Sequence, residues 1–409
     1  MRVLRCLALA VSFAAMTVCA VGAENNNEWP WSQRAADAAM ARWPNGRFAP
    51  AGANWSWNYE LGTLLQGIDD VYLNTGDKRY YDYIKNSVDQ FVSSDGSIPT
   101  FKADEYQLDS ILLGRQLLEL YGVTQDKRYL TAAKLLVDQL DHQPRTASGA
   151  YWHKQRYPNQ MWLDGLYMAE PFRAEYASLS HHPEKFSDIT HQFALIEEHA
   201  RDAKTGLIYH GWDESKQQRW ANKTTGDSPE FWGRAMGWYM MALVDVLDRY
   251  PEGDPGKKQL IAYLARDAAA VAKVQDELSG LWYQVLDKAG AKGNYLESSA
   301  SCMFVYALAK GVRRGYLPQR YLSNAVRGYA GILKHFISIA PEGDVSLTDT
   351  VKVGGLGGEP YRDGSYGYYI GEKRVTNDPK GVGAFLMAAS EMEHAKPGHG
   401  AARAAGMRH

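Results

Sequence analysis

The stretch Thr75-Gly76-Asp77-Lys78-Arg79-Tyr80 separates two amphipathic segments, one opening at Leu61 and the other running from Tyr80 to Phe91. Apolar residues recur at helical spacing on both sides of this turn. Asp is a preferred residue immediately before a helix, because its carboxylate accepts a hydrogen bond from the first turn. The stretch therefore predicts a helical hairpin with a short polar turn.

The same turn recurs further along the chain. A second copy, Gln125-Asp126-Lys127-Arg128-Tyr129, lies 49 positions later and precedes a helix expected over 130–140. A weaker copy, Gln319-Arg320-Tyr321, precedes a helix expected over 325–336. Each copy has an Asp or a Pro near the helix start and a Tyr that we expect to be buried. Recurrence of one unit predicts stacked helix pairs, either as an open solenoid or as a closed ring.

The connections favour the closed ring. Long connections rich in aromatic residues and Gly, at 144–163, 205–232 and 353–380, alternate with short polar turns. This asymmetry predicts one functional end and one plain end. Strand-like runs are few, and Gly206-Leu207-Ile208-Tyr209-His210 and Gly280-Leu281-Trp282-Tyr283-Gln284 are interpreted as short pieces within loops. The predicted fold class is all-α.

Composition narrows the function. The chain has 409 residues, 45% of them hydrophobic, which is enough for a large core. Its formal net charge of −2 gives no basic surface that would indicate nucleic acid as a partner. The 12 Trp and 26 Tyr are typical of carbohydrate binding, since sugar rings stack on aromatic rings. The alternative is that these aromatic residues fill the core.

The first 23 residues have the pattern of a secretory signal peptide. Arg2 and Arg5 precede an apolar run from Leu7 to Val21, and Val21-Gly22-Ala23 supplies small residues at a cleavage site. The run is too short to indicate a membrane span. Cleavage would leave a mature charge of −4. We expect export, to a bacterial periplasm or the medium, with no membrane attachment after cleavage and a domain over 24–394 followed by a disordered tail over 395–409.

Cysteine usage agrees with this location. Cys6 and Cys19 lie in the expected signal peptide, so Cys302 alone remains and no internal disulfide can form. A disulfide-free exported protein suits a bacterial periplasm better than a eukaryotic extracellular module. We interpret Cys302 as a small buried residue rather than a catalytic thiol.

One carboxylate stands in an apolar run, Gln160-Met161-Trp162-Leu163-Asp164-Gly165-Leu166-Tyr167-Met168. Ionising an acid in apolar surroundings is costly, so such a group tends to keep its proton. A carboxyl of this kind can donate and accept protons at working pH. Asp164 is therefore the first candidate for catalysis. Asp109, in Gln107-Leu108-Asp109-Ser110, is the second candidate and is expected at the start of an inner helix; the alternative is a charge that complements the helix dipole.

Aromatic loops carry further candidates. His153 and Lys154 precede Asp164 by one loop, and His210 repeats the pairing of His with a nearby Trp. Arg234 lies in an aromatic helix start, where its planar fork could bind a substrate carboxylate. The alternatives are surface histidines and a structural salt bridge from Arg234 to Glu230 or Asp227.

Other chemistries lack their motifs. The chain has no His-Glu-x-x-His segment, no cysteine pair for zinc, no phosphate-binding loop and no Gly-x-Ser-x-Gly segment. The segment Gly354-Gly355-Leu356-Gly357-Gly358 lacks a following Lys-Ser and is interpreted as a flexible loop. We therefore expect no metal and no organic cofactor.

From about Trp55 onward, several separated motifs resemble those of glycoside hydrolase family 105, the unsaturated rhamnogalacturonyl hydrolases. Family 88, the unsaturated glucuronyl hydrolases, is a more distant resemblance. The motifs, in chain order, are Gly149 to Phe172, His210-Gly211-Trp212-Asp213-Glu214, Ser228 to Trp238, Asn294-Tyr295-Leu296-Glu297-Ser298-Ser299, Thr376-Asn377-Asp378 and Gly381-Val382-Gly383-Ala384-Phe385.

The resemblance implies an (α/α)6 barrel, six helical hairpins in a closed toroid. It also implies an enzyme that acts on oligosaccharides released by polysaccharide lyases, which carry a 4,5-unsaturated uronic acid at the non-reducing end. A protonated Asp would donate its proton to C4, and water would add at C5 with the same carboxylate as base. The hemiketal would then open and release the neighbouring sugar. The rule that links two-carboxylate spacing to stereochemistry would not apply.

The resemblance assigns roles to individual residues. Asp164 matches the catalytic acid and base, and Asp109 matches a second Asp thought to position the site and help keep Asp164 protonated. The residues that match the sugar pocket are Tyr59, His153, Lys154, Trp162, His210, Trp232 and Arg234.

The implied substrate is an unsaturated galacturonyl–rhamnose fragment of pectin, hydrolysed without a cofactor. The alternatives are an unsaturated glucuronyl hydrolase acting on ulvan or glycosaminoglycan disaccharides, a polysaccharide lyase, and a non-catalytic sugar-binding toroid. The sequence leaves open the aglycone sugar and the residue that holds the uronate carboxylate.

Overall fold

The computed structural model describes residues 30–49 and 55–394. The expected signal peptide over 1–23 and the expected tail over 395–409 lie outside these residues. Within the described ranges, no helix is both long enough and apolar enough to cross a membrane.

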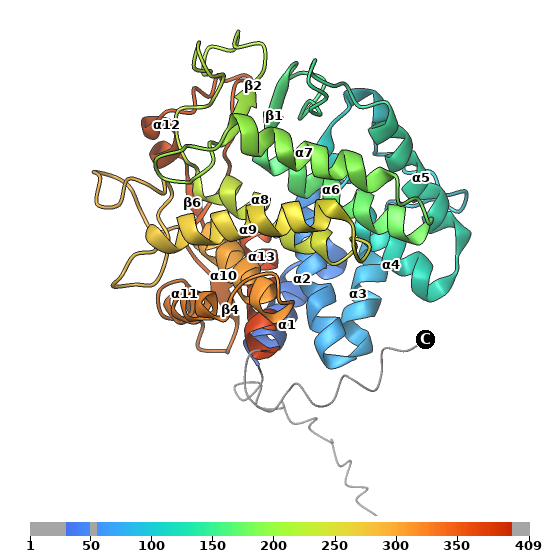
Figure 1. The fold of residues 1–409 in the computed structure, drawn as a ribbon. Coiled ribbons are helices and arrows are strands. Elements are labelled where there is room, and N and C mark those ends of the chain that lie inside the picture. Colours follow the sequence, from blue (N-terminus) through green and yellow to red (C-terminus); the bar gives the residue numbers. More distant parts are fainter. Residues whose placement is uncertain (1–29, 50–54, 395–409) are drawn as a thin grey trace, which may run out of the picture.

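Six inner helices of the described chain form a closed ring (Figure 1). Each packs against the next in chain order, and the last returns to contact the first. The interior helix α8 is buried along its whole length. The ring consists of α2 (Tyr59–Thr75), α4 (Gly114–Thr124), α6 (Leu163–Leu179), α8 (Gly233–Leu247), α10 (Ser298–Arg313) and α13 (Pro379–His394).

An outer helix covers each inner helix. The pairs are α2 with α3, α4 with α5, α6 with α7, α8 with α9, α10 with α11, and α13 with α1. Five of these pairs are hairpins of consecutive helices, and the sixth joins the two ends of the described chain. This arrangement confirms the predicted all-α barrel of six helix pairs. The outer helices are α1 (Trp31–Arg42), α3 (Lys78–Asp89), α5 (Lys127–Asp141), α7 (Lys185–His199), α9 (Pro255–Lys273) and α11 (Leu322–His335).

The recurring turn caps the outer helices as its sequence predicts. The Asp77 carboxylate accepts a hydrogen bond from the Arg79 backbone N–H at 2.9 Å, and Asp126 accepts from Arg128 at 3.0 Å. The third copy differs, because Pro318 precedes a short 3-10 helix, η5 (Gln319–Tyr321), without a side-chain cap.

The Tyr of each turn joins neighbouring outer helices. The Tyr80 hydroxyl donates to Asp37 of α1 at 3.1 Å, and the Tyr129 hydroxyl donates to Asp89 of α3 at 2.6 Å. Both Tyr rings are buried, as predicted. A local sequence repeat thus becomes a repeated contact between one hairpin and the next.

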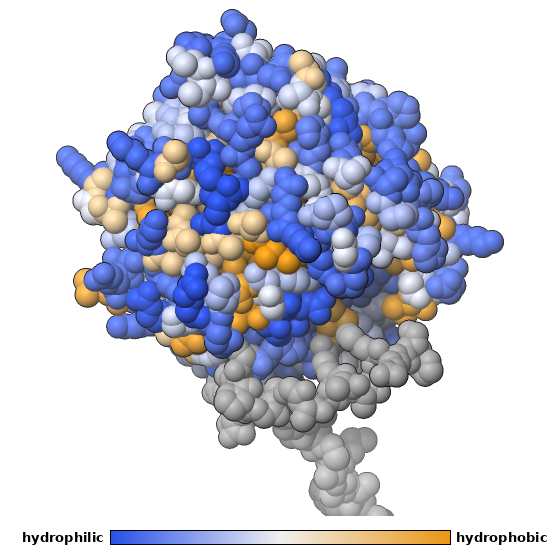
Figure 2. Space-filling view, in the orientation of Figure 1, coloured by the Kyte–Doolittle hydropathy of each residue, from blue (hydrophilic) through white to orange (hydrophobic). Residues whose placement is uncertain are grey.

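The long connections gather at one end of the barrel, where Figure 1 shows β1, β2 and α12 beyond the helix ends. Strands are short and pair only in twos within the described residues. The hydrophilic exterior carries only scattered apolar residues on the face shown in Figure 2. The remaining elements are β1 (Gln160–Trp162), β2 (Gly211–Asp213), β3 (Ile337–Ile339), β4 (Val345–Leu347), β5 (Thr350–Val351), β6 (Arg374–Val375), α12 (Tyr366–Gly371), η2 (Pro44–Gly46), η3 (Ala103–Glu105) and η4 (Leu108–Ser110).

The ring closes where α13 meets α2, through glycines on both helices. A Cβ atom placed on Gly383 would lie 2.3 Å from the Thr63 carbonyl oxygen, and one placed on Gly67 would lie 2.6 Å from the Gly383 carbonyl oxygen. Both distances are shorter than any ordinary van der Waals contact. The first and last inner helices can therefore approach this closely only because neither residue has a side chain.

This closure generates a stability prediction. We expect Gly383→Ala to lower the free energy of unfolding by about 1–3 kcal/mol, because the added methyl forces two packed helix backbones apart. Chemical denaturation followed by circular dichroism measures the change.

Gly122 provides the matched control. It also lies in a helix, but it is exposed and a Cβ there would meet no atom within 4 Å. Gly122→Ala should leave stability unchanged or raise it by up to about 1 kcal/mol, since Ala favours helix more than Gly does. Equal effects of the two substitutions would contradict the role assigned to the glycine contact.

Candidate active site

A two-stranded ribbon places the candidate acid beside a histidine. Strands β1 and β2 are antiparallel, with Trp162 opposite Gly211. The Leu163 N–H extends the pairing by donating to the His210 carbonyl at 3.0 Å. Asp164 follows in the first turn of α6, where the dipole of the helix favours negative charge. Residues 46 positions apart in the chain are thereby brought to one point of the barrel.

His210 links Asp164 to a tyrosine. Its Nε2 lies 3.1 Å from Asp164 Oδ2, and its Nδ1 lies 2.6 Å from the Tyr369 hydroxyl oxygen. The Nε2 and Oδ2 atoms are both buried and neither meets hydrogen-bond geometry with any described residue. Catalytic hydrogen bonds are often poorly aligned before substrate binds. Tyr369, on α12, was missed from the sequence; the only signal was its place in the aromatic 353–380 connection.

Asp109 lies in the 3-10 turn η4, just ahead of α4, and not at the start of the inner helix as predicted. The turn is held from both sides, by the Leu108 N–H donating to the His153 carbonyl at 3.1 Å and by the Trp57 indole donating to the Ser110 carbonyl at 2.7 Å. The helix begins only at Gly114, whose Cα packs against the Phe172 ring. Asp109 therefore lies in the first turn of η4 and ahead of the first turn of α4.

The charge of Asp109 is compensated locally. Burial alone would raise the pKa of Asp109, but the Lys154 ammonium, which donates a hydrogen bond to the carboxylate, and the nearby His153 and Arg156 lower this pKa below its usual range. Lys154, expected to contact the sugar, is thus engaged with Asp109 in this structure. Asp109 and Lys154 thus form an ion pair at the edge of the site.

His153 is a neutral ring in this site. It is only 2% exposed, and burial lowers its pKa to about 4, although the Asp109 carboxylate 3.5 Å from its Nε2 opposes the shift. Its ring stacks on Trp162 with centroids 4.4 Å apart. The surface-histidine alternative for His153 is wrong, and so is the same alternative for His210, which is fully buried.

Two tryptophans flank His210. The ring centroids of Trp162 and Trp232 lie 5.4 Å and 4.7 Å from that of His210. Both indoles are themselves packed, since Trp162 stacks on Tyr157 and Trp232 stacks on Tyr369. They form a rigid aromatic wall behind the histidine.

Arg234 carries a buried charge without a carboxylate partner among the described residues. It is 2% exposed and donates from Nη1 to the Val351 carbonyl at 2.6 Å and toward the Ser299 hydroxyl at 3.4 Å. Glu230, one partner expected from the sequence, pairs with Lys288 instead. The predicted alternative of a structural salt bridge to Glu230 or Asp227 is therefore wrong.

Both charges of the site, Asp109 and Arg234, act on Tyr59. Burial raises the pKa of its phenol well above the usual value, with the Asp109 anion adding to this rise and Arg234 opposing it. Tyr59 therefore stays protonated and can donate a hydrogen bond. With Tyr59, all nine residues singled out in the sequence lie around one site, and they belong to four of the six inner helices or to the segments that lead into them.

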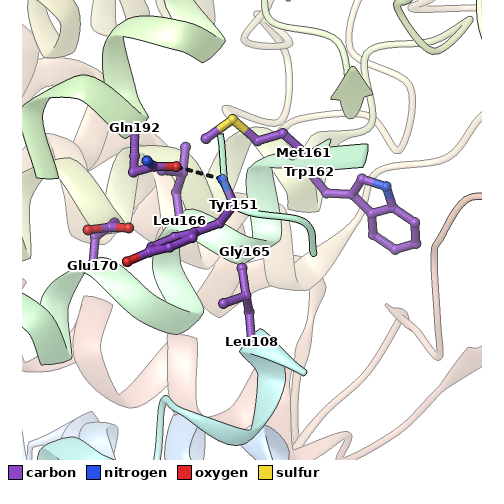
Figure 3. Close-up of a pocket in the computed structure, with 8 residues that line it drawn as sticks. All are labelled: Leu108, Tyr151, Met161, Trp162, Gly165, Leu166, Glu170 and Gln192. Carbon is purple, nitrogen blue, oxygen red and sulfur yellow. Dashed lines mark hydrogen bonds between the residues drawn. The ribbon is translucent and has the colours of Figure 1, made fainter. Parts of the chain in front are cut away.

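A small cavity lies next to Leu108 and Gly165, which are the chain neighbours of Asp109 and Asp164 (Figure 3). Gly165, next to Asp164, is needed there, since a Cβ would lie 2.9 Å from Leu108 and 3.1 Å from His153. Burial raises the pKa of Glu170 to about 7 despite the opposing charge of Arg173. The cavity is lined by Leu108, Tyr151, Met161, Trp162, Gly165, Leu166, Glu170 and Gln192.

The glycine-rich segment over 354–358 is packed against the site rather than free. Leu356 is fully buried, and a Cβ on Gly354 would lie 2.4 Å from the Trp232 ring. The segment covers the aromatic wall, and its glycines allow that close approach. Among the described residues, no group of three or more His, Cys, Asp or Glu side chains is placed to hold a metal ion.

Comparison with known proteins identifies relatives along most of the chain. The model of Glycosyl Hydrolase Family 88 matches residues 31–396. A solved glycoside hydrolase of family 105 from C. acetobutylicum ATCC 824 is 44% identical, with a TM-score of 0.86 over 89% of this chain and 99% of that one.

Two curated relatives are also similar. Protein Atu3128 from Agrobacterium fabrum is 42% identical over 230 residues, which are 55% of this chain and 97% of that protein. The unsaturated rhamnogalacturonyl hydrolase YesR from Bacillus subtilis is 29% identical over 279 residues, 67% of this chain and 75% of that protein. The resemblance inferred from the motifs is thus confirmed, and the chain belongs to the family 88 and family 105 glycoside hydrolases.

Proposed function

We propose that this glycoside hydrolase acts on lyase-derived pectin oligosaccharides, hydrating the double bond of a terminal unsaturated galacturonyl residue and releasing rhamnose. The observation that carries the proposal is Asp164 in the first turn of α6, 3.1 Å from His210, with the compensated anion Asp109 acting on the same buried His153 as Asp164 does. The 29% identity with YesR supports the choice of a rhamnogalacturonan fragment.

The chemistry needs one carboxyl group in two states. The Asp164 O–H donates its proton to C4 of the vinyl ether, and positive charge develops at C5 and the ring oxygen. The resulting carboxylate then removes a proton from water as the water oxygen bonds to C5. The hemiketal opens to a 4-deoxy-5-keto uronate and the neighbouring sugar leaves. Asp109 stays ionised beside Lys154 and stabilises the positive charge from a short distance.

Arg234 supplies the matching contact for the uronate. A guanidinium that is almost fully buried and forms no direct salt bridge among the described residues is costly, and a substrate carboxylate would offset this cost with two parallel hydrogen bonds. Tyr59, held protonated by burial, would donate a hydrogen bond to the same sugar. The contact between Arg234 and the carboxylate would make the enzyme select a uronyl substrate over a neutral sugar.

The direct test incubates the protein with an unsaturated galacturonyl–rhamnose disaccharide and follows the ultraviolet absorbance of the double bond. Loss of absorbance with release of rhamnose supports the proposal. Loss with an unsaturated glucuronyl disaccharide alone would reassign the substrate. A gain of absorbance from a saturated polymer would indicate a lyase, and binding without change would indicate a sugar-binding protein.

The role of Asp164 predicts a large kinetic effect. We expect Asp164→Asn to lower kcat by a factor on the order of 10² to 10⁴ while substrate still binds, because the amide keeps the shape but cannot donate the proton. Steady-state kinetics and calorimetric binding measure the two effects. Asp104→Asn, at an exposed acid on η3, should leave both unchanged. A near-normal rate for Asp164→Asn would refute the assignment.

Asp109 predicts a combined effect on stability and rate. Asp109→Asn removes the anion beside Lys154, so we expect a loss of stability of about 1–3 kcal/mol near neutral pH and a slower turnover. Because the pKa of Asp109 is lowered in the folded protein, this stability difference is present above the unfolded pKa and should shrink as the pH falls through that of the folded state. Denaturation at several pH values measures it; a difference independent of pH would be contrary to the ion pair.

We further propose that the protein is exported to the periplasm. The support is the pattern of the first 23 residues, Arg2 and Arg5 followed by an apolar run and Val21-Gly22-Ala23. Mass spectrometry of the protein from a bacterial periplasmic extract should find Glu24 at the N-terminus. Ala23→Phe should block that cleavage, because the site requires a small residue. Recovery of a chain that still begins at Met1 from the cytoplasmic fraction would contradict export.

A further inference from the structure

Tyr369, His210 and Asp164 form a buried line that ends at the proposed catalytic carboxyl. The Tyr369 hydroxyl lies 2.6 Å from His210 Nδ1, and His210 Nε2 lies 3.1 Å from Asp164 Oδ2. Tyr369 and His210 are both fully buried. The histidine can reach Asp164 with only one ring nitrogen, Nε2. The protonation state of Nε2 therefore decides whether Asp164 faces a hydrogen-bond donor or an acceptor.

The tyrosine decides that proton state. His210 Nδ1 is the one hydrogen-bond partner of the Tyr369 hydroxyl among the described residues. Burial raises the pKa of Tyr369 well above its usual value, so the phenol keeps its proton. A buried O–H that donates to nothing is costly, so this O–H donates to Nδ1. Nδ1 is then the acceptor, so the ring proton of His210 lies on Nε2, facing Asp164.

We propose that Tyr369 is a positioning residue for the reaction: by donating to Nδ1 of His210, it holds the Nε2–H toward the oxygen of Asp164 on which negative charge develops. The inference rests on the proposed function. A donor aimed at a developing charge stabilises the transition state more than the ground state. Tyr369 itself touches no reacting atom.

The orientation of the tyrosine is fixed independently of the histidine. Its ring stacks on Trp232 with centroids 5.7 Å apart and an interplanar angle of 19°. Its backbone carbonyl accepts a hydrogen bond from the Gln284 side chain at 3.1 Å, and the same side chain accepts one from the Trp232 indole at 3.2 Å. The hydroxyl can therefore be removed without freeing the ring.

Other charged or titratable groups also face the line. Those around Tyr369 are Tyr368, Asp164, Glu230 and Arg362. His153 faces His210 and Asp164 from the opposite side, with Asp109 and Lys154 behind it. His153 is neutral near neutral pH, and Asp109 and Lys154 compensate each other. The hydrogen bond from Tyr369 is thus the contact that distinguishes the two nitrogens of His210.

Nitrogen-15 NMR of histidine-labelled protein tests the proton state without substrate. We expect wild-type His210, assigned by its absence in His210→Gln, to show a proton on Nε2 and none on Nδ1. In Tyr369→Phe the two nitrogens should move toward a mixture of both forms. A wild-type proton on Nδ1 would overturn the proposal, whether or not the protein hydrolyses the expected disaccharide.

The pH dependence of turnover tests the consequence. Tyr369→Phe should lower kcat about tenfold, because the donor facing the developing charge is no longer held. It should also move the alkaline limb of the pH–kcat profile to higher pH by about half a unit to one unit, since the Asp164 oxygen on which negative charge develops loses the donor that is held toward it. A purely structural role of Tyr369 would lower the yield of folded protein without moving this limb.

The adjacent tyrosine is the matched control. Tyr368 lies on the same short helix, and among the described residues no hydrogen bond joins its hydroxyl to His210. Tyr368→Phe should leave both the limb and the spectrum of His210 unchanged. The proposal would be overturned if Tyr368→Phe moved the alkaline limb and the His210 spectrum as far as Tyr369→Phe does. It would also be overturned if Tyr369→Phe had wild-type stability and left the limb unmoved.

Discussion

The close contact of α2 with α13 is the constraint on which this barrel depends. A helix packed at ordinary distance leaves room for side chains, but here Gly383 approaches the Thr63 carbonyl so closely that a single methyl does not fit. The inner helices form a closed ring, so a displacement at this contact cannot be absorbed at a free end. The positions of the loops that carry the site follow from this closure.

Electrostatics at the two ends of the barrel serve different purposes. Deep among the inner helices, Asp245 of α8 pairs with Arg115 of α4 at 2.8 Å and with Lys310 of α10 at 2.6 Å. Such a network is fully compensated, and it joins three helices that are not consecutive in sequence. At the loop end, by contrast, Arg234 is buried without a carboxylate partner among the described residues. A buried charge that forms no salt bridge within the described chain indicates where a ligand of opposite charge binds.

The two candidate carboxyls are also treated differently by their surroundings. Asp109 is held as an anion by Lys154, whereas Asp164 meets His210 and a wall of aromatic rings. Two carboxyls with different environments can take different roles in one reaction. The sequence predicted that repulsion from the Asp109 anion helps to keep Asp164 protonated. Because Lys154 pairs with Asp109 and offsets its charge, this repulsion is weakened. Positioning and stabilisation of positive charge are the better-supported roles for Asp109.

The sequence by itself determined the helical hairpins, because the Asp77 and Asp126 turns and the apolar spacing around them act within a few residues. It also marked Asp164, Asp109 and the aromatic loops as candidates, since their chemistry can be read from residue type and from several motifs in one order. Only the tertiary structure decided that Lys154 pairs with Asp109, that Arg234 has no carboxylate partner in the described chain, and that Tyr369 meets His210. Those contacts join residues 45 to 159 positions apart, and their distances depend on how the whole ring closes.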